Sequence, residues 1–252
     1  MSELQINMGV GSRQGKRWAS NWKSIEDFTK FLNWRNELRN FTKESHLNSQ
    51  RILDELKDLY PEESDLMYVA EAWQTWQRIV MQISTDKEKD LERLDFVTNK
   101  AIELNPESAD AYAVRAFVGL SLLNTGCEAA QTNVIKAEES GSTADTLQIV
   151  GRVYALCGDL KKAIRSSRNA LKLVPNDTGW FVTGALVINL YETGQIEEIY
   201  KLLGENIEAK DMDQNVLAIY AFLEHKRVTK SLLKNICREQ KTMAFQELDL
   251  KD

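Results

Sequence analysis

Residues 144–177 read ADTLQIVGRVYALCGDLKKAIRSSRNALKLVPND, and this stretch decides the fold. Apolar side chains recur at helical spacing on both sides of Gly158 and Asp159, which predicts a helix, a tight turn and a second helix. Pro175 cannot continue the second helix and therefore ends the unit. We expect the two helices to approach closely at small residues, which are Gly151, Ala163 and Ala170.

The three prolines of the chain follow segments of the same kind. Pro61, Pro106 and Pro175 each end an apolar helical stretch, and each is followed by a polar link and a new apolar and aromatic stretch. The 69 residues from Pro106 to Pro175 divide into intervals of 34 and 35. A helix–turn–helix unit repeated every 34 residues is the signature of tetratricopeptide repeats (TPRs).

Residues 144–177 resemble one TPR. Leu147, Val150, Gly151 and Tyr154 match the first-helix pattern W-x2-L-G-x2-Y, with Leu147 in place of Trp. Ser167 departs from the family, which usually has a large apolar residue at that place. The resemblance extends to further helix pairs, and it becomes weaker with distance from this unit. These pairs are expected at about 24–40 with 43–59, in the segment before Pro106, at 109–143, from 178 onward, and at 213–225 with 228–238. The pair before Pro106 contains an insertion of about 11 residues.

The resemblance implies an all-α, TPR-like superhelix (solenoid) of about five to six helix pairs. First helices of the pairs line its concave side, and second helices line its convex side. We expect an N-terminal arm at 1–23, the repeat domain at 24–240 and a C-terminal tail at 241–252. The arm carries a net charge of +3. Three interpretations of it stay open: packing along its own solenoid, a dimer contact, or a basic patch for an acidic partner.

A second resemblance is less specific. The run from FLNWRNELRNF at residue 31 to AIELNPESADAYA at residue 101 is similar to the TPR region found C-terminal to bacterial class III adenylate/guanylate cyclase domains. In those proteins the region is a regulatory or protein-contacting appendage. The helices expected over 24–240 leave no room for the cyclase domain itself, so the similarity implies a regulatory module related to such enzymes.

The sequence contains no motif that selects a catalytic, metal or cofactor site. His46 and His225 are the only histidines and lie at opposite ends of the chain, outside any zinc-ligand or nucleophile spacing. The glycines between Gly9 and Gly15 form GxGxxxG, which is one residue too long for a dinucleotide site. We therefore expect a protein that is not an enzyme and that needs no cofactor.

Composition narrows the class of partner and the compartment. The 252 residues carry a net charge of −6, and the pI is about 5.2, which argues against nucleic-acid binding. No apolar stretch is long enough to span a bilayer, so we expect no membrane contact. Cys127, Cys157 and Cys237 form no CxxC pair and are expected to be reduced, mostly buried thiols in a cytoplasmic protein.

Helical spacing also predicts a partner-binding groove on the concave face. Its side chains are expected to be Tyr68, Trp76, Phe117, Gln148, Arg152, Phe181 and Ile188. Arg152 either binds a carboxylate or carbonyl of the ligand or pairs with an acid such as Asp145 or Asp110. Only one of the predicted groove positions is cationic, which argues against the multi-cation carboxylate clamp of chaperone-binding relatives and favours an apolar or helical partner.

Three functional hypotheses follow. The first is a non-catalytic scaffold that binds a protein or peptide in the concave groove. The second is a regulatory module related to a nucleotide cyclase. The third is a homo-oligomerising scaffold that forms a homodimer through the N-terminal arm.

Overall fold

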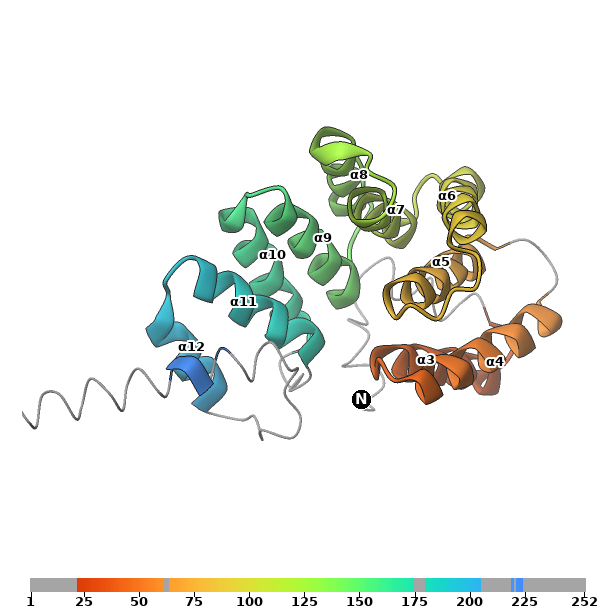
Figure 1. Ribbon diagram of the computed structural model, residues 1–252, viewed down its shortest axis with the longest axis horizontal. Helices are drawn as coiled ribbons and strands as arrows, with labels where there is room; N and C mark the ends of the chain where they lie inside the picture. The colour runs from red at the N-terminus through yellow and green to blue at the C-terminus, as the bar shows by residue number, and fades with distance from the viewer. Residues whose placement is uncertain (1–21, 61–63, 175–179, 205–218, 220, 224–252) are drawn as a thin grey trace, which may run out of the picture.

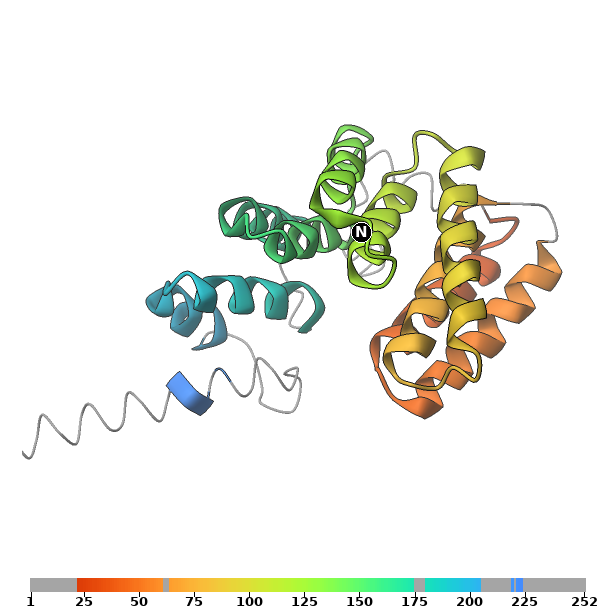
Figure 2. The ribbon, with the colours of Figure 1, turned by 45° about the horizontal axis from the view of Figure 1, so that its top comes forward.

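The computed structural model describes residues 22–60, 64–174, 180–204, 219 and 221–223. In these residues every regular element is a helix, and consecutive helices pack as hairpins that follow one another around an arc (Figure 1). The tilted view in Figure 2 shows the same succession of pairs. This arrangement confirms the expected all-α, TPR-like superhelix.

Five helix pairs lie within the described residues. They are α3 (Ile25–Arg39) with α4 (Lys43–Leu59), α5 (Asp65–Val80) with α6 (Lys87–Leu104), α7 (Ala109–Ser121) with α8 (Gly126–Glu139), α9 (Ala144–Leu156) with α10 (Leu160–Leu173), and α11 (Ala185–Glu192) with α12 (Ile196–Gly204). A π-helix, η1 (Trp180–Gly184), leads into α11 and was not predicted. The pair predicted at 213–225 and 228–238 falls almost entirely outside the described residues, as do the arm up to residue 21 and the tail at 241–252.

Polar side chains fix where most of these helices begin. In each case an oxygen of the residue before the helix accepts a hydrogen bond from the backbone N–H three positions later, and the residues that do so are Ser24, Thr42, Asp86, Ser108, Thr143 and Asp159. Each cap satisfies a donor that the helix leaves unpaired and stabilises it by about 1 kcal/mol. These caps fix the residue at which each of these six helices begins.

The close approach of α9 and α10 depends on Gly151. A Cβ at this position would lie 3.0 Å from the Ser167 hydroxyl oxygen and 3.2 Å from the Ala163 carbonyl oxygen. Ser167, which departs from the family pattern, lies at this contact with its small side chain. The turn that follows uses Gly158 at φ +81°, a left-handed conformation that favours glycine.

One continuous core runs through the first pairs, and Trp73 joins its parts. This half-buried side chain packs against the buried cluster of α3 and α4, the cluster between α5 and α6, and the cluster formed by α7 to α10. Each hairpin therefore buries its apolar face against its neighbours, as repeat proteins require.

The cysteines differ from the expectation of reduced thiols. Cys127, near the start of α8, and Cys157, which caps the end of α9, form a disulfide across two successive hairpins, with Cα atoms 5.6 Å apart. Their separation of 30 residues is close to one repeat, so successive units bring the two positions together. The prediction of reduced thiols was wrong for this pair, and Cys237 lies outside the described residues.

Among the described residues, none of the helices combines the length and the apolar character needed to cross a bilayer.

Candidate functional site

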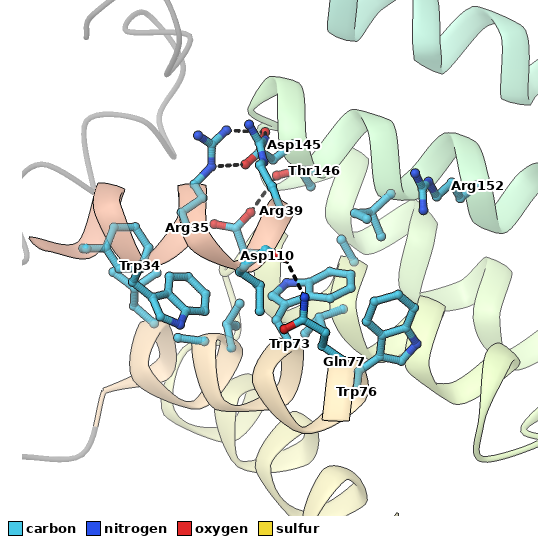
Figure 3. Close-up of a pocket in the computed structure, with 18 of the residues that line it drawn as sticks. Trp34, Arg35, Arg39, Trp73, Trp76, Gln77, Asp110, Asp145, Thr146 and Arg152 are labelled. Atoms are coloured by element: carbon cyan, nitrogen blue, oxygen red, sulfur yellow. Dashed lines mark hydrogen bonds and ion pairs between the residues drawn. The ribbon is translucent and has the colours of Figure 1, made fainter. Parts of the chain in front are cut away.

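A pocket opens on the concave face of the first four repeats. Its walls come from α3, α5, α7 and α9, which are the first helices of their pairs (Figure 3). The second helices of these pairs contribute no lining residue. The cavity measures about 100 Å³, and apolar cavities of about 150 Å³ accept a benzene-sized group. The pocket therefore fits one compact side chain and is too small for a helix about 10 Å across.

Aromatic rings form much of the wall. Trp73 and Trp76 of α5 meet edge to face with ring centres 5.7 Å apart, and both lie within 5.6 Å of the Phe117 ring, which is buried behind them. On the α3 side, Phe31 stacks on Trp34 at 5.3 Å. Aromatic pairs of this geometry contribute about 1 kcal/mol each beyond the burial of their area. The wall is therefore stiff as well as apolar.

Two arginines of α3 reach across the concave face to Asp145 at the start of α9. Arg35 donates from Nε to Oδ2 at 2.5 Å and from Nη2 to Oδ1 at 2.6 Å. Arg39 donates from Nη2 to Oδ1 at 2.5 Å. These contacts join the first repeat to the fourth, over 106 to 110 residues of sequence. They bridge α3 and α9 at the pocket wall, as Figure 3 shows.

Asp145 is held in its charged form. Burial alone would raise the pKa of its carboxyl, but the charges of Arg35 and Arg39, with the hydrogen bonds they donate, lower that pKa to about 2. Only 19% of the Asp145 side chain and 12% of the Arg35 side chain are exposed. The ion pair is therefore screened much less by solvent than a surface pair.

A second carboxylate lines the same wall. Asp110, in the first turn of α7, accepts a hydrogen bond from the Thr146 hydroxyl at 2.7 Å. Thr146 follows Asp145 in α9, so the start of α9 is tied both to α3 and to α7. These polar contacts orient α9 where it faces the pocket.

Gln77 connects the pocket wall to a buried polar network behind it. Its side-chain nitrogen donates to the Leu38 carbonyl at 2.7 Å, so its oxygen is the acceptor that faces His46 Nδ1 at 2.8 Å. Gln74 donates to the His46 carbonyl, and Ser49 donates to Gln74. The network holds α4 and α5 together and fixes the end of α3.

Phe41 sits at the lip of the pocket in a strained backbone conformation. Its φ is +51°, in the left-handed region that bulky residues rarely adopt. The residue is 39% exposed, and its ring meets that of Trp76 edge to face with ring centres 5.7 Å apart. Strain of this kind costs about 1 kcal/mol or more and concentrates at functional sites. The α3–α4 turn thus presents an exposed aromatic ring at the pocket entrance.

The structure distributes the predicted groove residues unevenly. Trp76 and Arg152 line the pocket. Phe117 and Gln148 are buried, Tyr68 packs edge to face on Phe96 of α6, and Ile188 is half-buried in α11. Phe181 belongs to η1, but its side chain lies outside the described set. The pocket therefore gathers two of the seven side chains that helical spacing selected.

The sequence analysis did not predict the side of the pocket that α3 forms. The pocket residues that it did not select as groove positions include Trp34, Arg35, Arg39 and Phe41. A signal was available, because Phe31, Trp34, Arg35, Leu38 and Arg39 follow helical spacing on one stripe of α3. The long-range pairing with Asp145 had no local signal.

Within the part of the chain that the structure describes, no group of three or more His, Cys, Asp or Glu side chains is arranged to hold a metal ion.

Comparison with known proteins shows the fold. No protein-family model matches the sequence, and no curated protein matches it. The solved structures that match include TTC0263, a thermophilic TPR protein of Thermus thermophilus, at 17% identity and a TM-score of 0.51, over 76% of this chain and 97% of that one. They also include PilW, a type IV pilus biogenesis factor, at 13% identity and a TM-score of 0.48, over 75% of this chain and 82% of that one. The likeness to TTC0263 shows a TPR-like fold.

Proposed function

We propose that this TPR-like chain is a non-catalytic scaffold that binds a protein or peptide through the concave pocket of its first four repeats. The observation that carries the proposal is the convergence of four first helices on one apolar, aromatic cavity. The size of the cavity and its aromatic wall favour a partner that inserts a single apolar side chain. Phe41 supports the proposal because it holds an exposed ring at the entrance despite a strained backbone.

The partner-binding residues follow from this geometry. Trp76 and Arg152 are proposed to contact the partner, as expected from the sequence, together with Trp34 and Phe41. The buried Phe117 supports the wall, and the proposal gives no contact role to the other predicted residues, which are Tyr68, Gln148, Phe181 and Ile188. The domain limits at 23 and 240 also remain proposals.

Site-specific photo-crosslinking tests the function. Replacing Phe41 by p-benzoylphenylalanine keeps an aromatic ring at the lip, and the same replacement at Ile135, 50% exposed on α8, is the matched control. We expect one set of proteins to be crosslinked from position 41 and not from position 135. Ala113→Met, which fills the pocket, should abolish that crosslink, whereas Ala129→Met on the exposed surface of α8 should not. Crosslinks that form only from position 135, or that survive Ala113→Met, would contradict the proposal.

The alternatives have less support. The link to nucleotide cyclases rests on the sequence resemblance alone. Homodimerisation through residues 1–23 involves a segment that lies largely outside the described residues, and sedimentation of a variant lacking it tests that idea. The cytoplasmic location also stays a prediction, and the Cys127–Cys157 disulfide weighs against it because disulfides persist mainly in oxidising compartments.

A further inference from the structure

A disulfide holds the end of a helix that forms part of the pocket wall. Helix α9 contributes Ile149 and Arg152 to that wall. Its start is fixed by Asp145, which accepts hydrogen bonds from α3, and its end is fixed by Cys157, which is bonded to Cys127 of α8. The two wall residues therefore lie between two attachments. A helix held at both ends keeps its direction, whereas a helix released at one end can shift about the other.

The disulfide lies where another molecule can reach it. Cys127 and Cys157 are half-buried, and a glycine stands beside each of them, Gly126 before Cys127 and Gly158 after Cys157. A Cβ placed on either glycine would meet no atom of the described residues within 4 Å, so open space adjoins both cysteines. Disulfides that other thiols can reach are reduced more readily than buried structural ones, and they include the regulatory ones.

Contacts around the disulfide keep the two hairpins packed without it. Val150 of α9 belongs to the same buried cluster as Ala130 and Val134 of α8. The Tyr154 hydroxyl of α9 also donates to Glu138 near the end of α8 at 2.9 Å. Reduction would therefore leave α8 and α9 in contact and would free the end of α9. The expected change is a local shift of the helix and not global unfolding.

We propose that Cys127 and Cys157 form a redox switch for the pocket. In the oxidised chain the bond fixes the end of α9, and the pocket binds its partner. In the reduced chain the end of α9 shifts, the wall that carries Ile149 and Arg152 shifts with it, and binding weakens. This inference rests on the proposed function and adds the regulation of that same pocket.

The reductant is a protein dithiol, a pair of cysteines in another protein. A thiolate of the dithiol attacks one sulfur of the disulfide, the bond between Cys127 and Cys157 breaks, and the other cysteine leaves as a thiolate and takes up a proton. The second thiol of the dithiol then attacks the mixed disulfide and releases the remaining cysteine. Two electrons and two protons pass to the Cys127–Cys157 pair, and the dithiol becomes a disulfide.

Reduction of the native, full-length protein is the first test. The protein is mixed, without denaturant, with a thioredoxin-type dithiol protein that a reductase and NADPH keep reduced. Free thiols are then alkylated and located by mass spectrometry. We expect Cys127 and Cys157 to be reduced together and to re-form their bond in oxidised glutathione, and Cys237→Ser should behave in the same way. A pair that is reduced only in denaturant, or a bond that involves Cys237, would overturn the switch.

Binding to the pocket is the second test. The probes are N-acetylphenylalanine amide and N-acetylleucine amide, which each present one apolar side chain. Their binding is followed by the NMR shifts of the indole N–H groups of Trp34, Trp73 and Trp76, which line the pocket. We expect the oxidised protein to bind at least one probe about fivefold or more tightly than the dithiothreitol-reduced protein. The double variant Cys127→Ser/Cys157→Ser should bind like the reduced protein and should not respond to dithiothreitol.

The outcomes separate the switch from the proposed function. Equal binding by the oxidised and reduced proteins, or tighter binding by the reduced protein, would overturn the switch and leave the docking pocket. Circular dichroism of the reduced wild type checks that its helices persist, and their loss would overturn the switch because the bond would then be structural. Failure of both probes to bind in either redox state would overturn the proposed function as well.

Discussion

Arg35 in α3 and Asp145 in α9 lie 110 residues apart in the sequence and form a two-point ion pair, with donor–acceptor distances of 2.5 and 2.6 Å. The pair spans the concave face from the first repeat to the fourth. In a solenoid whose units contact only their neighbours, such a contact requires strong curvature. The curvature encloses the pocket, so the geometry of the binding site and the stability of the ion pair are linked.

Asp145→Asn should destabilise the protein markedly. The substitution keeps the size of the side chain but leaves Arg35 and Arg39 without their carboxylate at a largely buried site, and we expect a loss of about 3 kcal/mol in the free energy of unfolding. Urea unfolding followed by circular dichroism measures it. The control is Asp95→Asn, which breaks an ion pair with Arg115 at a half-exposed carboxylate and should cost less than about 1 kcal/mol. Equal losses of unfolding free energy in the two variants would show that the ion pair of Asp145 with Arg35 and Arg39 is no stronger than a surface pair.

The contribution of Asp145 should vanish in acid. Its pKa is about 2 in the folded chain against an ordinary value of 3.8, so the unfolded chain binds the proton more readily. The ionised group therefore stabilises the fold fully above about pH 4, by about 2 kcal/mol, and this contribution is lost as the pH falls toward 2. The stability difference between the wild type and Asp145→Asn should shrink by about 1 kcal/mol between pH 6 and pH 3. A stability difference between the two proteins that stays constant from pH 6 to pH 3 would contradict the lowered pKa of Asp145.

Much of the repeat architecture was predictable because its signals are local. Pro106 and Pro175 mark helix ends, Gly158 marks a turn, and the small residue Gly151 marks a close helix contact. Each of these signals acts within one hairpin. The helix pair at 25–39 and 43–59 was likewise predictable within one residue, because Ser24 and Thr42 are strong helix caps.

The binding site was less predictable because it depends on contacts between distant repeats. From the sequence, Asp145 and Asp110 are candidate partners for Arg152, whereas the structure pairs Asp145 with Arg35 and Arg39 of α3. Which first-helix side chains face the cavity depends on how far each repeat rotates relative to the last. Small rotations decide that Arg152 lines the pocket while Gln148, four residues earlier, is fully buried.

Two buried glutamines should respond oppositely to the same substitution. Both are fully buried, but among the residues that the structure describes the side chain of Gln148 has no hydrogen-bond partner, while Gln77 bonds to His46 and to the Leu38 carbonyl. Gln148→Met removes an unsatisfied amide at similar volume and should stabilise the protein by about 1 kcal/mol. Gln77→Met breaks two satisfied bonds and should destabilise it by about 2 kcal/mol. Thermal unfolding of the two variants shows whether each substitution raises or lowers the stability. A loss of stability in Gln148→Met would contradict the interpretation that its buried amide is unsatisfied.

The disulfide should be a measurable source of stability. Cys127 and Cys157 close a loop of about 30 residues, and replacing both by serine should lower the free energy of unfolding by about 3 kcal/mol. Adding dithiothreitol to the wild type should have a similar effect, and adding it to the double serine variant should have none. Wild-type stability that is insensitive to the reductant would show that the bond makes no contribution.

The central claim is that the first and fourth repeats meet across the concave face and so enclose the pocket. A double-mutant cycle between Arg35→Gln and Asp145→Asn, measured by urea unfolding, tests it most directly, because coupling energies of this size arise between residues in contact. We predict a coupling energy of at least about 1 kcal/mol. If the two single changes in the free energy of unfolding sum to that of the double variant within about 0.3 kcal/mol, the contact between Arg35 and Asp145 would be contradicted, and with it the enclosed site.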